Sequence, residues 1–181
     1  MDAVSQLRQS KLAIRFAQHD LDGDGFLEES DYLTLALRLC DRLDAAPALR
    51  EAICAGFADQ WRQLCSHADI NLDGHISLAE YTSAMGAGIA GDADGLDRAV
   101  LQTTRAVVQA ADSDGDGYLD LRDYERLAEL LKVDNAAESF QVLDTDADGR
   151  LGSDEIAAAV RDFYTSDDPE ASGNLIFGRA G

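Results

Sequence analysis

The chain has 181 residues, which is enough for one compact domain or two small ones with an apolar core. It carries 35 Asp and Glu residues against 15 Lys and Arg residues, and the resulting net charge of −20 disfavours binding to nucleic acid or to anionic membranes. The apolar content of 46% argues against general disorder, so we expect a folded protein whose acidic groups are neutralised by cations or basic partners.

The chain shows no targeting or membrane segment. Its first residues, MDAVSQLRQSKLAIRF, lack an apolar stretch followed by a small-residue cleavage site. The longest uncharged stretch, YTSAMGAGIAG, has 11 residues and is too short to cross a bilayer. Cys40, Cys54 and Cys65 lack the spacing of a zinc site, and we expect all three to be buried, reduced thiols. These features predict a cytoplasmic protein.

Four acidic segments follow one another along the chain and fit a single template. They are DLDGDGFLEESD (20–31), DINLDGHISLAE (69–80), DSDGDGYLDLRD (112–123) and DTDADGRLGSDE (144–155). Residues with side-chain oxygens stand at positions 1, 3 and 5, Gly at position 6, an apolar residue at position 8 and an acid at position 12. Calcium takes roughly six to eight oxygen ligands, and Gly at position 6 permits the sharp turn that wraps the loop round the ion. The repeat therefore predicts up to four calcium sites.

The template also predicts the ligands, which are side chains at most positions and the backbone carbonyl at position 7. In the first loop they are Asp20, Asp22, Asp24, Phe26, Glu28 and Asp31. In the second loop they are Asp69, Asn71, Asp73, His75, Ser77 and Glu80. In the third loop they are Asp112, Asp114, Asp116, Tyr118, Asp120 and Asp123. In the fourth loop they are Asp144, Asp146, Asp148, Arg150 and Glu155. At Ser77 and Gly152, which occupy position 9, we expect a water to complete the ligand set.

Apolar residues at helical spacing flank every loop. Phe16, Cys65, Val108 and Phe140 stand four residues before the loops, and Tyr32, Tyr81, Tyr124 and Ile156 directly follow them. This helix–loop–helix pattern resembles the EF-hand family over essentially the whole chain. The resemblance implies an all-α fold of four EF-hands in two packed pairs within one compact globule. We expect short two-stranded contacts at position 8, between Leu27 and Ile76 and between Leu119 and Leu151.

The loop spacing predicts an N-terminal pair over residues 1–90, a C-terminal pair over 91–164 and an apolar tail over 165–181. The long first gap should hold two helices that break between Asp44 and Pro47, with Pro47 in the first turn of the second helix. Residues 86–95, GAGIAGDADG, predict a short bend that lets the two pairs pack together. For the tail, docking of Leu175, Ile176 and Phe177 in the protein's own cleft is favoured over a frayed terminus.

The unequal first pair, the short linker and the apolar tail resemble the sarcoplasmic calcium-binding proteins and their bacterial relative calerythrin. The resemblance implies a compact cytoplasmic calcium-binding protein, and we expect a monomer. One site is often degenerate in that family, usually the second. Here the second loop keeps Asp69, Asn71, Asp73 and Glu80.

The first and third loops close on Asp31 and Asp123, whereas the others close on Glu80 and Glu155. Glu can give both oxygens to the ion, which suits calcium, while the shorter Asp tends to give one, and the lower coordination number suits magnesium. We therefore expect mixed Ca²⁺/Mg²⁺ binding at the two Asp-closed loops. The alternative is that the closing Asp has no effect on selectivity.

Two functions remain open, a calcium buffer and a calcium-dependent regulator that docks an unidentified protein partner. Sensors open a Met-rich groove on binding calcium, but Met1 and Met85 are the only methionines here. Scarce methionine and a docked tail favour the buffer.

Catalysis is not expected. Coelenterazine photoproteins share the four-hand architecture and use several His, Trp and Tyr residues in a cavity. This chain has His19, His67, His75 and a single Trp61, and surface or loop roles fit the three histidines better. No nucleophile–base spacing or phosphate loop is present.

Overall fold

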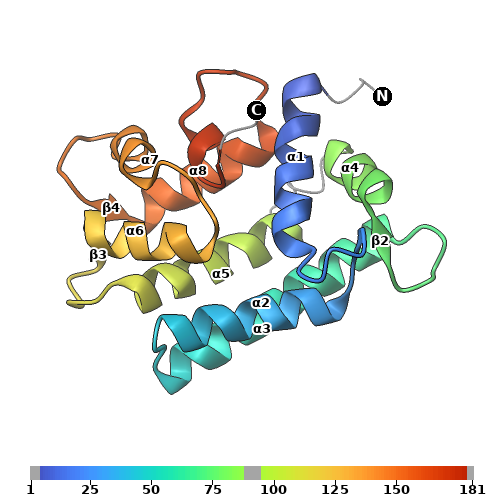
Figure 1. Ribbon diagram of the computed structural model, residues 1–181, viewed down its shortest axis with the longest axis horizontal. Coiled ribbons are helices and arrows are strands. Elements are labelled where there is room, and N and C mark those ends of the chain that lie inside the picture. Colours follow the sequence, from blue (N-terminus) through green and yellow to red (C-terminus); the bar gives the residue numbers. More distant parts are fainter. Residues whose placement is uncertain (1–4, 88–94, 179–181) are drawn as a thin grey trace.

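The computed structural model describes residues 5–87 and 95–178, and its helices follow the predicted pattern (Figure 1). The α-helices in this part of the chain are α1 (Gln6–His19), α2 (Glu29–Arg42), α3 (Pro47–Ala68), α4 (Leu78–Gly86), α5 (Leu96–Ala111), α6 (Leu121–Leu130), α7 (Ala136–Leu143) and α8 (Ser153–Thr165). A short 3₁₀ helix, η2 (Ser172–Leu175), follows them. The predicted bend over residues 86–95 falls mostly on residues 88–94, which lie outside the described residues.

The first gap between loops contains the predicted helix break. α2 ends at Arg42, Asp44 adopts a left-handed backbone conformation with φ of 49°, and Pro47 is the first residue of α3. Proline fits this place because its ring presets helical φ and the first-turn amide has no intrahelical partner. The break lets α3 fold back along α2.

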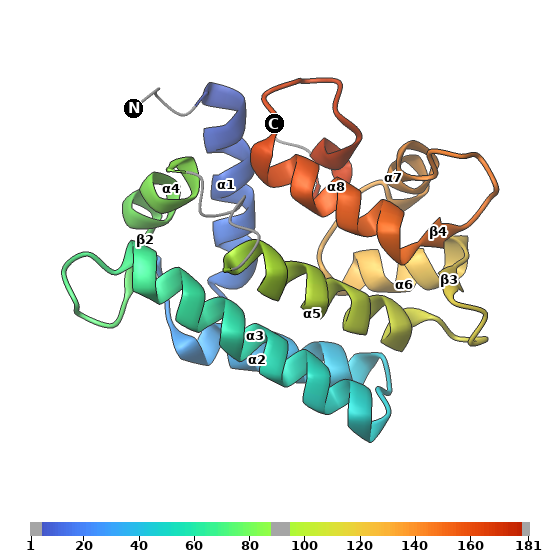
Figure 2. The same cartoon turned by 180° about the vertical axis from the view of Figure 1, so that it is seen from behind.

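Two small antiparallel sheets join the loops in pairs, as predicted. β1 (Phe26–Leu27) pairs with β2 (Ile76–Ser77), and β3 (Tyr118–Leu119) pairs with β4 (Leu151–Gly152). Leu27 is opposite Ile76 and Leu119 is opposite Leu151, and all four side chains are fully buried. The two sheets lie at opposite sides of the molecule (Figures 1 and 2).

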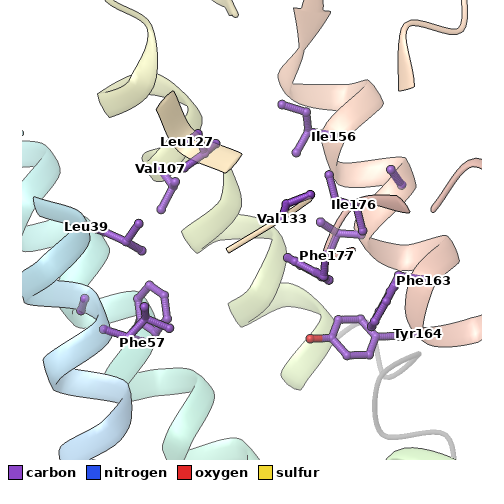
Figure 3. Close-up of a cluster of buried hydrophobic side chains, with 14 of the residues drawn as sticks. Leu39, Phe57, Val107, Leu127, Val133, Ile156, Phe163, Tyr164, Ile176 and Phe177 are labelled. Carbon is purple, nitrogen blue, oxygen red and sulfur yellow. The ribbon is translucent and has the colours of Figure 1, made fainter. Parts of the chain in front are cut away.

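One apolar core runs through both pairs, which confirms that they pack into a single globule. α5 packs along α3 on one side and against α8 on the other. Figure 3 shows Leu39 and Phe57 on the α2–α3 side of this core, Val107 on α5, and Ile156 and Phe163 on α8. Within the described ranges, no helix is both long enough and apolar enough to span a bilayer.

The expectation of three buried thiols is only partly correct. All three cysteines are free thiols and Cys40 is buried, but Cys54 and Cys65 are half-buried. Cys65 lies in the last turn of α3, where its Sγ approaches Asp69 Oδ2 of the second loop at 3.7 Å. Its place at the edge of an open loop explains why the core does not cover it.

Candidate metal centre

Each loop turns on its position-6 glycine, as the template predicts. Gly25, Gly74, Gly117 and Gly149 have φ values of 91°, 82°, 90° and 82°, a region that side chains disfavour. Each glycine amide donates a hydrogen bond to the position-1 carboxylate of its own loop. The four N–O distances are 3.1 Å to Asp20, 3.1 Å to Asp69, 2.8 Å to Asp112 and 2.9 Å to Asp144. The backbone therefore wraps round the first aspartate of every loop.

Further backbone amides hold the remaining carboxylates in place. In the first loop the amide of Asp24 donates to Asp22 Oδ1 at 3.2 Å, and the amide of Phe26 donates to Asp24 Oδ1 at 2.9 Å. The same two bonds recur in the other three loops. At Asp112 slight burial opposes ionisation, but hydrogen bonds from Gly117 and Gly115 hold its pKa below the ordinary value. The loop backbone thus favours the charged form that a cation needs.

Three loops gather their acids into clusters that could hold a metal ion. The carboxylates at positions 1, 3 and 5 lie within 4.8 Å of one another in each of them. The clusters are Asp20, Asp22 and Asp24; Asp112, Asp114 and Asp116; and Asp144, Asp146 and Asp148. Three like charges at this distance repel one another, and a divalent cation between them removes the repulsion.

The second loop is arranged differently. Asn71 stands at position 3, and its Nδ2 donates to Asp73 Oδ2 at 2.9 Å, while its Oδ1 accepts from the Asp73 amide at 3.0 Å. Asp69 and Asp73 are therefore the only acids among its first five positions. The ligand pattern of this loop is kept, but its oxygens carry less charge.

The position-12 carboxylates do not join the clusters in this structure. Asp31, Glu80 and Glu155 instead accept from the N-cap amide of the helix that leaves the loop, whereas Asp123 accepts from the Ser113 amide at 3.4 Å. Asp31 accepts from the amides of Leu21 at 3.1 Å and Glu28 at 2.9 Å, and Glu155 accepts from the amides of Thr145 at 2.9 Å and Gly152 at 3.0 Å. These bonds tie the end of a loop to its beginning.

The two kinds of closing residue differ in burial. Asp31 and Asp123 are 6% and 4% exposed, whereas Glu80 and Glu155 are half-buried. The shorter side chain keeps its carboxylate against the loop backbone. Burial raises the pKa of Asp31, although hydrogen bonds from the amides of Glu28 and Leu21 oppose this shift.

Side chains at position 7 of the Glu-closed loops reach across the sheets to the Asp-closed loops. His75 Nδ1 lies 2.7 Å from Glu28 Oε1, and Arg150 Nη1 lies 2.8 Å from Asp116 Oδ2. The sequence template predicts only a backbone carbonyl ligand at His75 and Arg150. It therefore did not predict that their side chains contact the neighbouring loop. The signal was a basic residue at position 7 of each Glu-closed loop and an aromatic one at that place in each Asp-closed loop.

The prediction of surface or loop roles for all three histidines is wrong for His19. Its ring is 3% exposed and lies edge-on to Tyr32, with ring centroids 4.6 Å apart. Neither ring nitrogen has a hydrogen-bond partner among the described residues. Burial lowers the pKa of His19 well below its ordinary value, so the ring is neutral. The inward face of α1 carries His19 into the core, while His67 and His75 are exposed.

Comparison with known proteins agrees with this geometry. The EF hand family matches residues 105–128 and 137–160, which contain the third and fourth loops with flanking helix. Calerythrin of Saccharopolyspora erythraea is 26% identical over 167 residues, covering 89% of this chain and 94% of calerythrin. Sarcoplasmic calcium-binding protein 1 of Astacus leptodactylus is 26% identical over 189 residues, covering 97% of this chain and 95% of that protein.

The fold is also found among solved structures. A calcium-binding protein of Streptomyces coelicolor superimposes with a TM-score of 0.76. Its structure is described as the basis for prokaryotic calcium-mediated regulation by that protein. It is 27% identical, and the match covers 87% of this chain and 98% of that one. The name of the sarcoplasmic calcium-binding protein states calcium binding, which agrees with the acid clusters in the loops of this chain.

Proposed function

We propose that this chain, which is an EF-hand calcium-binding protein related to calerythrin and the sarcoplasmic calcium-binding proteins, acts as a calcium buffer of the cytoplasm. The observation that carries the proposal is the place of the C-terminal segment. Ile176 and Phe177 are 5% and 7% exposed and lie in the core beside α8 (Figure 3). Leu175 is half-buried. The segment thus fills space that a target helix would need.

The C-terminal segment is fixed by polar contacts as well as by burial. Lys11 Nζ donates to the Ser166 carbonyl at 2.7 Å and to Asn174 Oδ1 at 3.1 Å, and Gln18 Nε2 donates to the Phe177 carbonyl at 2.8 Å. Gly173 packs so closely on α8 that an added Cβ would lie 2.6 Å from the Phe163 backbone nitrogen. A partner that entered this core would have to break all these contacts. This cost favours a protein that binds ions without exposing a docking groove.

The metal complement of the proposal follows the loop geometry. The three acid clusters, together with Asp69, Asp73 and Glu80 of the second loop, support up to four calcium sites. We propose that Mg²⁺ competes at the loops closed by Asp31 and Asp123. The protein is proposed to work as a monomer, with residues 1–90 and 91–164 as its two EF-hand pairs and residues 165–181 as the docked tail.

Calcium titration in the calorimeter, repeated in millimolar magnesium, tests this proposal together with hydrophobic-dye binding. A buffer should bind calcium at its loops while dye fluorescence stays low with and without the ion. A large calcium-dependent rise in dye fluorescence, or capture of a protein only in calcium, would contradict the buffer role.

The second candidate is a calcium-dependent regulator. It is favoured by the similarity to the Streptomyces coelicolor protein, whose structure is described in terms of calcium-mediated regulation. A regulator requires the C-terminal segment to leave the core in one metal state. Hydrogen exchange of residues 174–178 with and without calcium separates the two functions, because only a regulator exposes these amides while calcium is bound.

A further inference from the structure

A groove of about 400 Å³ lies between α1, α2 and the C-terminal end of α6, and Leu21 of the first loop also lines it. Among the described residues, its charged lining consists of Arg15, Arg38, Arg42 and Lys132 together with one acid, Glu129. We propose that this basic groove binds a single, dissolved amphipathic anion. Such an anion carries a carboxylate or phosphate group on a short apolar chain. The inference goes beyond calcium buffering and does not depend on it.

The charge of the basic groove is opposite to that of the whole chain. The chain has more than twice as many acids as bases, 35 against 15, but the groove is lined by four bases and one acid. Such a concentration of cations creates a local attraction for anions on a protein that otherwise repels them. The net charge of −20 repels the whole protein from an anionic bilayer. A small dissolved anion can enter the groove without bringing the rest of the protein close to a charged surface.

Arg15 is a buried cation without a carboxylate partner. It is 7% exposed, and its hydrogen bonds go to neutral groups, from Nε to the Tyr164 hydroxyl at 3.2 Å and from Nη1 to Gln18 Oε1 at 3.2 Å. Its guanidinium lies 4.0 Å from the centroid of the Phe177 ring. Among residues 5–87 and 95–178, no carboxylate lies within ion-pair distance of it. A buried charge is costly without a counter-ion, so an anionic group in the groove would stabilise it.

The remaining three cations stand at the solvent edge of the basic groove. Arg38, Arg42 and Lys132 are exposed, and none of them makes an ion pair within the part of the chain that the structure describes. Arg42 lies in the last turn of α2, where a cation complements the helix dipole. That role does not account for Arg38 one turn earlier, or for Arg15 on another helix. Carboxylate and phosphate oxygens match the donors of such arginines.

The rest of the lining is apolar. Leu35 and Leu39 of α2 face Leu130 and Leu131 at the end of α6 across the groove. Leu39, Leu131 and Arg15 also line a smaller cavity of about 70 Å³ inside the core, whose other walls are mostly aliphatic and aromatic. An anion with an alkyl chain can therefore place its charge beside the arginines and its chain against leucine, which a bare inorganic anion cannot do.

The test is a calorimetric titration of the full calcium-loaded chain with octanoate, which is charged and monomeric, and with 1-octanol as the uncharged comparison. We expect saturable binding of octanoate and binding of octanol that is at least about tenfold weaker. Arg38→Gln combined with Arg42→Gln should weaken octanoate about tenfold. The matched control, Arg62→Gln combined with Arg98→Gln, removes the same charge from exposed positions outside the groove and should change binding less than about twofold.

Each opposite result overturns the proposal. The proposal is wrong if the wild-type protein shows no saturable octanoate binding, or if octanol binds as well as octanoate. It is also wrong if the control variant loses as much affinity as the groove variant. Binding to anionic vesicles without binding to monomeric octanoate would replace the proposed ligand by a membrane surface. Calcium titration of every variant shows whether the loops remain intact, so failure of the groove is separate from failure of the buffer.

Discussion

Replacing Phe177 with Ala tests whether the C-terminal segment belongs to the folded core. The ring is 7% exposed and lies 5.0 Å from the Phe163 ring and 4.0 Å from the Arg15 guanidinium, measured to ring centroids. Truncation of a buried Phe to Ala costs about 3–5 kcal/mol where the surrounding core cannot collapse. Phe177 lies in a short segment after α8 and η2, and the loss is limited to the free energy that docks this segment. We expect a loss of about 2–3 kcal/mol.

Urea unfolding of the calcium-loaded protein measures this loss, and hydrogen exchange locates it. The amides of Ile176 and Gly178, which donate to Gly173 and Leu175 carbonyls, should exchange much faster in Phe177→Ala. Val142→Ala on α7 is the control, because Val142 is 40% exposed and its truncation should cost less than about 0.5 kcal/mol. If Phe177→Ala and Val142→Ala lose equal stability, and the amides of Ile176 and Gly178 exchange as fast in the wild type as in Phe177→Ala, the segment is not part of the core.

Four other predictions follow from the loops and from α1. Glu80→Gln and Glu155→Gln should each remove one calcium ion from the complement seen by native mass spectrometry, and an unchanged count would contradict their role as ligands. Magnesium should compete mainly at the loops closed by Asp31 and Asp123, and Asp123→Glu should shift the third loop toward calcium in competitive titrations. Removal of calcium with a chelator should lower the melting temperature strongly, because binding to the folded state contributes about 2.7 kcal/mol per site at a hundredfold excess over Kd. His19→Phe should reduce the loss of stability on acidification. The folded state holds the His19 pKa well below its ordinary value of 6.5, so only the unfolded state takes up a proton as pH falls through 6.5, and wild-type stability should fall by up to about 1.4 kcal/mol per pH unit more steeply than that of the variant.

The fold was largely predictable because it depends on local periodicity. The position-6 glycines, the acids at alternate places and the apolar residues four positions before each loop fix a helix–loop–helix unit without reference to the rest of the chain. Pairing through Leu27 with Ile76 and through Leu119 with Leu151 then follows from the unit itself. The break before Pro47 was predictable for the same reason, since it depends on one residue's backbone.

The side-chain arrangement of the sites was less predictable because it depends on contacts between loops. The pairing of Arg150 with Asp116 joins residues 34 apart in the chain, and nothing in either loop alone demands it. The burial of Asp31 likewise depends on the fit of a short side chain against its loop backbone. Template positions state which residues can bind a metal, but they do not state where each carboxylate rests.

The burial of the polar face of α1 could not be predicted from the sequence. Lys11, Arg15 and His19 are four residues apart, so they share one side of the helix, which periodicity assigns to solvent. All three are buried, because α8 and the C-terminal segment cover Lys11 and Arg15 while Tyr32 covers His19. The basic groove depends on this burial, since it is what leaves Arg15 without a counter-ion.

The cover over α1 also sets the order in which the protein can be completed during synthesis. During synthesis α1 is made well before its partners, because the hydroxyl that accepts from Arg15 belongs to Tyr164, 149 residues later, and the carbonyl that accepts from Gln18 belongs to Phe177. In a nascent chain that stops after the second loop, Lys11 and Arg15, which are buried in the complete fold, therefore still face water. The final packing of α1 must wait until Tyr164 and Phe177 have been made, so contacts of high sequence separation complete the fold.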